Sequence, residues 1–143
     1  MLKAFAASLS LAVVAAGQTA SPSQNYQGLE MTVTKVERAT SASLRDCPPG
    51  TNTVSAVAKP GEQFALVTVA IKAGSDYKGA SLNGKRPTAE DDAGKKYFTP
   101  SYLVDFGSTT DFSCTFPFRV PEGTKLKTLK IETASFDLAS MDK

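Results

Sequence analysis

The chain of 143 residues carries 16 Lys plus Arg against 14 Asp plus Glu, a formal net charge of +2, and has no histidine. This near balance excludes the clustered positive charge that nucleic acids and anionic membranes require, so we expect no nucleic-acid partner. The absence of histidine excludes Ser/His/Asp and Cys/His catalysis and Cys/His zinc sites.

The N-terminus has the three-part pattern of a secretory signal peptide. Lys3 precedes an apolar run from Ala4 to Ala16, and small residues follow it. The run has about a dozen residues, too few for a membrane span of about 20. We predict a signal peptide over residues 1–16, cut after Ala16 or Gly17. The product is then secreted or periplasmic, with no membrane insertion after cleavage.

The mature chain has the length of a single domain. Removal of residues 1–16 leaves 127 residues, enough to bury a hydrophobic core. Residues 17–27 are small and polar, which predicts a flexible lead-in. The domain itself is expected over residues 28–143.

The strongest secondary-structure signals are three strands. Residues 29–34 alternate apolar and polar, with a bulge or strand end expected near Lys35. Residues 63–73 are apolar on both faces, as in a central strand. Residues 114–120 place Cys114 and three apolar side chains on the core side, while Pro117 points outward and places its strand at an edge or bulge.

Weaker signals complete an all-β pattern. Residues 53–57, "TVSAV", suit a short edge strand, and residues 86–107 suit two short strands around a turn at Asp91–Gly94. Residues 125–138 supply a last strand with Leu129 and Ile131 inward. No amphipathic helix of useful length is present. The pattern predicts an antiparallel β-sandwich of about seven strands.

The predicted export determines how we interpret the two cysteines. Cys47 lies in a long segment without apolar periodicity, and Cys114 lies on the core side of a strand. Disulfides persist in oxidising compartments, so a Cys47–Cys114 bond is favoured over a redox or metal pair and over two unrelated thiols. The bond would fasten a surface loop to a core strand.

Four stretches resemble the landmarks of a known family: "LEMTVTKVE", "PGEQFALVTVAIKAGS", "AEDDAGKKY" and "FPFRVPEGTKLKTLKIE". Their order and spacing over residues 28–133 are similar to those of a bacterial extracellular family of unknown function, near the secreted mycobacterial immunoprotective antigen. The resemblance implies an immunoglobulin-like fold in an envelope context and brings no catalytic residues. The chain departs from antibody domains in having no tryptophan.

Few groups suit catalysis or metal binding. Ser75-x-x-Lys78 followed by Ser81-x-Asn83 is superficially similar to the signatures of penicillin-interacting enzymes, but that chemistry needs a helix and these residues predict a loop. The carboxylates Glu90 to Asp92, or Asp105 and Asp111, could serve a hydrolase, and the cluster Glu90 to Asp92 could bind calcium. Adjacent residues at a strand turn point apart, however, and no EF-hand spacing exists. We expect no catalytic residue, cofactor or metal.

Aromatic side chains near loops give the candidate binding residues. Tyr77, Tyr97 and Tyr102 are possible partner-binding residues, because tyrosines in loops on a rigid sandwich often contact partners. The alternative is that Tyr97 and Phe98 cover a sheet edge.

Taken together, the sequence predicts a secreted or periplasmic, non-catalytic immunoglobulin-like domain that binds an unknown protein or envelope component. A small carboxylate-dependent hydrolase and a calcium-stabilised adhesive domain are the alternatives.

Overall fold

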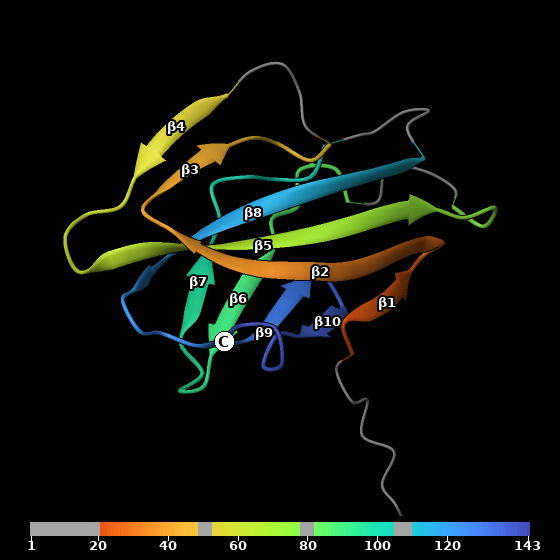
Figure 1. The fold of residues 1–143 in the computed structure, drawn as a ribbon. Helices are drawn as coiled ribbons and strands as arrows, with labels where there is room; N and C mark the ends of the chain where they lie inside the picture. The colour runs from red at the N-terminus through yellow and green to blue at the C-terminus, as the bar shows by residue number, and fades with distance from the viewer. Residues whose placement is uncertain (1–20, 49–52, 78–81, 105–109) are drawn as a thin grey trace, which may run out of the picture.

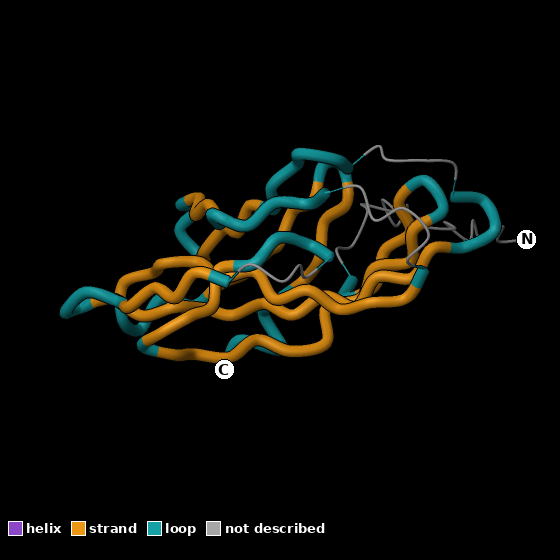
Figure 2. Tube along the Cα trace, turned by 90° about the horizontal axis from the view of Figure 1, so that it is seen from above, coloured by secondary structure: helices purple, strands orange, loops and turns teal. Residues whose placement is uncertain are grey.

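The computed structural model describes residues 21–48, 53–77, 82–104 and 110–143. The predicted signal peptide therefore lies outside the described residues, as do Lys78, Ser81 and Asp105. The described residues form ten strands. None of them forms a helix, and Figure 2 accordingly shows only strand and loop colours along this part of the chain. No helix among these residues is long and apolar enough to cross a membrane.

The first sheet contains four antiparallel strands in the order β1-β2-β5-β8. Their bounds are β1 Ser23–Tyr26, β2 Leu29–Ala39, β5 Glu62–Ala73 and β8 Asp111–Pro121. The predicted central strand is confirmed, since β5 lies between β2 and β8. The register of β2 shifts between Val33 and Lys35, which confirms the bulge. β8 is an edge strand, as Pro117 indicated.

The second sheet has the order β10-β9-β6-β7, also antiparallel. Its strands are β6 Thr88–Asp91, β7 Lys96–Phe98, β9 Leu126–Ile131 and β10 Ala134–Asp137. They run across the strands of the first sheet in Figure 1. The two sheets enclose one core, which includes fully buried side chains from both: Leu29, Met31, Val67, Phe116, Phe118, Leu129, Ile131 and Phe136.

A hairpin of two short strands stands apart from both sheets. β3 (Ser41–Leu44) pairs with β4 (Val54–Val57), and Figure 1 shows the hairpin beside the first sheet. The predicted short strand at residues 53–57 is thereby confirmed as β4.

The expected count of about seven strands is wrong, because ten are present among the described residues. The expected last strand is a hairpin, β9–β10, whose turn contains Glu132 at φ 52°. No glycine marks that turn, so no local turn signal predicts it. Part of the segment that we expected to be a flexible lead-in is a strand. Ser23–Tyr26 form β1, which pairs with β2 through its backbone although its side chains are mostly polar.

Candidate functional site

The β3–β4 hairpin lies over the outer face of the first sheet and leaves a groove beneath it. Leu66, Ser113 and Thr115 line this groove. They lie on the outer face because the side chains of a strand alternate, and their neighbours, such as Val67 and Cys114, are buried in the core. The groove has a volume of about 580 Å³.

The groove is lined mainly by small and hydroxyl-bearing side chains. The hydroxyls of Ser113 and Thr115 come from β8, and the less exposed Ala42 and Ala56 come from the hairpin. The charged residues lie at the end of β2 and just after β3. The lining residues are Glu37, Ser41, Ala42, Ser43, Arg45, Asp46, Ser55, Ala56, Val57, Leu66, Ser113 and Thr115.

The base of the hairpin is fixed to the first sheet. The backbone N–H of Ala58 donates to the carbonyl of Thr40 at 2.8 Å, which closes the hairpin where it leaves β2. From β8, the Arg119 guanidinium donates to the Val57 carbonyl at 3.0 Å and lies 4.7 Å from the centroid of the buried Phe64 ring. A cation over an aromatic ring is attracted to its face, so the Phe64 ring fixes the position of the guanidinium. The guanidinium in turn holds β4 through its hydrogen bond to the Val57 carbonyl.

The other end of the hairpin is fixed by the disulfide. Cys47 and Cys114 are bonded, with 5.5 Å between their Cα atoms, which confirms the predicted pairing. The backbone N–H of Cys47 donates to the Tyr102 carbonyl at 3.0 Å, and the Val104 N–H donates to the Cys47 carbonyl at 2.8 Å. Cys47 is fully buried rather than part of a surface loop. The chain after β3 is therefore held in the core, and the hairpin is attached at both ends.

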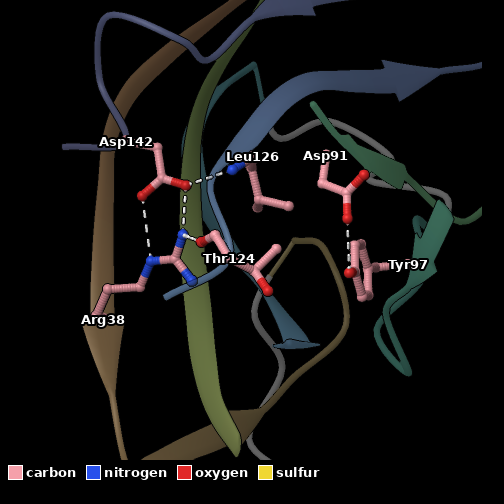
Figure 3. Close-up of polar contacts among 6 residues, drawn as sticks. All are labelled: Arg38, Asp91, Tyr97, Thr124, Leu126 and Asp142. Carbon is pink, nitrogen blue, oxygen red and sulfur yellow. Dashed lines mark hydrogen bonds and ion pairs between the residues drawn. The ribbon is translucent and has the colours of Figure 1, made fainter. Parts of the chain in front are cut away.

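An ion pair with a buried carboxylate fixes the end of β2 at Arg38, three residues before β3 begins (Figure 3). The Arg38 guanidinium bonds to both carboxylate oxygens of Asp142, one of them at 3.1 Å from Nε, and to the Thr124 carbonyl. The Leu126 N–H also donates to Asp142, at 2.6 Å. The Asp142 side chain is 2% exposed, so this contact locks the C-terminal segment against β2.

Two charged residues of the groove have no partner within the described parts of the chain. Glu37 pairs with Lys35 at 3.4 Å, whereas Arg45 and Asp46 make no hydrogen bond or ion pair there. Arg45 is exposed and Asp46 is half-buried. Both groups can therefore bind a ligand without first breaking a contact.

The structure does not bring the three candidate tyrosines together or place them in the groove. Tyr97 is buried, so its ring belongs to the core. Tyr102 is half-buried with the Arg86 guanidinium 5.5 Å from its ring centroid, and Tyr77 is half-buried against the core. Phe98, next to Tyr97 on the edge strand β7 of the second sheet, is 70% exposed, so the two side chains do not share one role.

The acidic β6–β7 hairpin uses its carboxylates within the protein. The Ala93 and Lys95 N–H groups each donate to Asp91 Oδ1 at 2.9 Å, and the Tyr97 hydroxyl donates to Oδ2 at 2.8 Å (Figure 3). The Tyr97 bond is the main cause that lowers the pKa of Asp91. Burial, followed by the bond to Asp91, raises the pKa of Tyr97.

The neighbouring carboxylate is engaged as well. Lys130 Nζ lies 2.8 Å from Glu90 and, by this hydrogen bond, lowers the pKa of Glu90. No cluster of three or more acidic, cysteine or histidine side chains suited to a metal occurs among the described residues. Of the serine–lysine motif, Ser75 lies in a turn after β5 and not on a helix.

Comparison with known proteins supports the β-sandwich fold and does not identify a family or a function. No protein-family model matches the chain, and no curated protein matches it in sequence. The crystal structure of an uncharacterized β-sandwich protein from Clostridium difficile 630 is similar, with a TM-score of 0.54 at 12% identity over 82% of this chain and 89% of that chain. The chain is accordingly an antiparallel β-sandwich.

The residues of the groove were missed by the sequence analysis, although one signal was present. The stretch "TSASLRD" at residues 40–46 joins hydroxyl and small residues to two opposite charges just before Cys47. A segment of that composition next to a predicted disulfide could have been predicted to be a binding loop that the disulfide keeps in place. The contribution of Ser113 and Thr115 depends on how the hairpin folds over β8, which no local pattern shows.

Proposed function

We propose that this chain is an extracytoplasmic, non-catalytic binding domain whose ligand occupies the groove beneath the β3–β4 hairpin. The carrying observation is that a hairpin attached at both ends leaves an open, polar groove containing the partnerless Arg45 and Asp46. A hairpin that only stabilised the fold would gain more by packing closely on the sheet, since cavities forfeit van der Waals contacts.

The location outside the cytoplasm rests on three supports. The N-terminal pattern is that of a signal peptide. The Cys47–Cys114 bond suits an oxidising compartment. The sequence also resembles the bacterial extracellular immunoglobulin-like family near the secreted mycobacterial antigen, and a β-sandwich fold is compatible with that resemblance.

The carboxylates expected for the hydrolase alternative, Glu90 to Asp92, Asp105 and Asp111, are not among the groove residues that the structure describes. A hydrolase acting in the groove would instead draw on Glu37 and Asp46, the two carboxylates that line it. The Glu37 side chain is 54% exposed and already paired with Lys35, and the Asp46 side chain lies in an open groove. A carboxyl group that acts as a general acid is typically shielded from water by an apolar pocket. The groove therefore favours binding over hydrolysis.

Filling the groove tests the proposal. Ser113 is exposed on the groove side of β8, so Ser113→Tyr should occupy the space without disturbing the core. Thr128→Tyr, on the outer face of β9 in the second sheet, is the matched control. Each variant and the unsubstituted protein are immobilised and incubated with envelope extract and culture medium, and the retained compounds are identified by mass spectrometry.

We expect a component that the unsubstituted protein and Thr128→Tyr retain and that Ser113→Tyr loses. Equal retention by all three proteins, or retention by none, would contradict the proposed function.

A further inference from the structure

The two partnerless charges of the groove are opposite in sign and adjacent in the chain. Arg45 is exposed and Asp46 half-buried, and both line the groove. A guanidinium pairs with a carboxylate through two parallel hydrogen bonds, and a carboxylate accepts from an ammonium group. Together they match a ligand that carries one group of each sign.

The hydroxyls of the groove match a ligand with alternating donors and acceptors. A serine or threonine hydroxyl can donate one hydrogen bond and accept others. Thr115 already shares a hydrogen bond of 2.9 Å with Thr68 and retains capacity for another. Amide N–H and carbonyl groups alternate along a peptide main chain, so the hydroxyls of Ser113 and Thr115 on the sheet side of the groove can serve both kinds.

The groove has no surface for a stacked ring. None of the lining residues that the structure describes is aromatic, and Ala42 and Ala56 leave room for a main chain. Bases and other flat ligands gain much of their affinity by stacking on aromatic side chains. A peptide main chain needs no such surface, and the volume of about 580 Å³ lies within the usual range of ligand sites.

We infer that the groove binds a short zwitterionic peptide, with its carboxylate on Arg45, its ammonium group on Asp46 and its amides on the hydroxyls of Ser113 and Thr115. This inference rests on the proposed function, because it names the ligand class of the same groove. Capture of the free ends of peptides is an established mode of recognition.

An NMR titration of the disulfide-intact, ¹⁵N-labelled protein tests the inference. The probes are triglycine with free ends, N-acetyl-triglycine amide with the same main chain and no charges, and maltotriose as a neutral sugar. We expect triglycine to give saturable shifts for the amides of residues 41–46, 55–57 and 113–115. The blocked peptide should bind at least about tenfold more weakly, and maltotriose should leave these amides unchanged.

Charge-neutralising variants make the test specific. Arg45→Gln and Asp46→Asn should each weaken triglycine binding about tenfold, which corresponds to one charge-assisted contact. Arg86→Gln and Asp92→Asn, both exposed and outside the groove, should leave it unchanged. A dispersed spectrum shows for every variant that the fold is intact.

The outcomes separate this inference from the proposed function. Groove shifts with maltotriose but not triglycine, or equal binding of free and blocked peptides, would overturn the zwitterionic peptide and leave the groove as the binding site. No groove shift with triglycine would also overturn the peptide inference, while the Ser113→Tyr comparison judges the site independently. Triglycine shifts confined to the second sheet would likewise overturn the peptide inference, and the Ser113→Tyr comparison would still decide whether the groove is the binding site.

Discussion

Asp142 shows how a single residue near the C-terminus supports the strand that carries the hairpin. Its carboxylate accepts from Arg38 and from the Leu126 N–H, and its side chain is only 2% exposed. Removing one member of a buried ion pair leaves the other charge uncompensated, which is more costly than losing an exposed pair.

We therefore expect Asp142→Ala to lower the free energy of unfolding by about 3 kcal/mol. Urea unfolding followed by circular dichroism measures it. Lys35→Ala, which breaks an ion pair whose side chains are 56% and 54% exposed, is the control and should cost less than about 1 kcal/mol. Equal small losses in the two variants would show that Asp142 does not hold the strand end.

The Tyr97–Asp91 hydrogen bond makes stability depend on pH in two directions. Because the pKa of Asp91 is lowered in the fold, its contribution is present above the ordinary value of about 3.9 and is lost as pH falls through the lowered pKa. Because the pKa of Tyr97 is raised, its contribution is present below about 10 and is lost as pH rises through the raised pKa.

Tyr97→Phe should accordingly be less stable than the unsubstituted protein near neutral pH. The difference in urea midpoint should narrow at about pH 3 and again at about pH 11. Urea unfolding across this range measures the difference. A difference that is the same at every pH would mean that the bond carries no such linkage.

For single residues, sequence patterns predicted which side chains are buried in the core, but they did not predict which side chains contact each other. Cys114, Phe116, Phe118 and Val120 were expected inward from their alternation, and all four are buried. The Arg38–Asp142 pair joins residues 104 positions apart, so no local pattern could reveal it.

The β3–β4 hairpin and its disulfide are the element on which the proposed site depends. The bond joins residues 67 positions apart, from the end of the hairpin segment to β8. Cross-linking so long a loop lowers the conformational entropy of the unfolded chain. In the chain-entropy model this raises the free energy of unfolding by about 4 kcal/mol.

The double variant Cys47→Ala/Cys114→Ala should lose about 4 kcal/mol of stability. In the folded state, amide exchange at position 47 and at Val104 should accelerate, because these N–H groups form the backbone bridge beside the bond. Hydrogen exchange followed by NMR measures this, with the Val67 amide in the central strand as an internal reference. Unchanged exchange at position 47 would contradict the role of the bond as an anchor.

Elements with strong periodicity were predictable, and so were the short strands β4, β6 and β7, whereas other short strands were not. β5 is apolar on both faces and β8 alternates strictly, so composition alone defined them. β1, β3 and β10 have four residues each, and β1 and β3 consist largely of polar or small residues. Their pairing is set by neighbouring strands rather than by their own side chains.

For the whole molecule, the sequence defined the architecture but not the site. Two apolar faces separated by turns predict a sandwich, because each face must be buried against another. The groove exists only because the hairpin folds back over the outer face of the first sheet. That arrangement requires contacts between Arg119 and Val57 and between Cys47 and Cys114, which are distant in the chain.

Export is a prediction about the whole molecule. Expressed in an export-competent host, the protein should be recovered outside the cytoplasm with its N-terminus after Ala16 or Gly17. Intact mass spectrometry before and after reduction should also show the gain of two hydrogen atoms from one disulfide. Retention of residues 1–16 or two free thiols would contradict the extracytoplasmic assignment.

The most direct test of the account is a fragment screen mapped by NMR on the ¹⁵N-labelled protein. The screen uses a chemically diverse library, so it asks where the molecule binds ligands without assuming what they are. The account predicts that shift changes gather on the hairpin, residues 41–46 and 55–57, and on Ser113 and Thr115 across the groove. Hits gathered around Phe98 on the second sheet, or scattered without a common site, would contradict it.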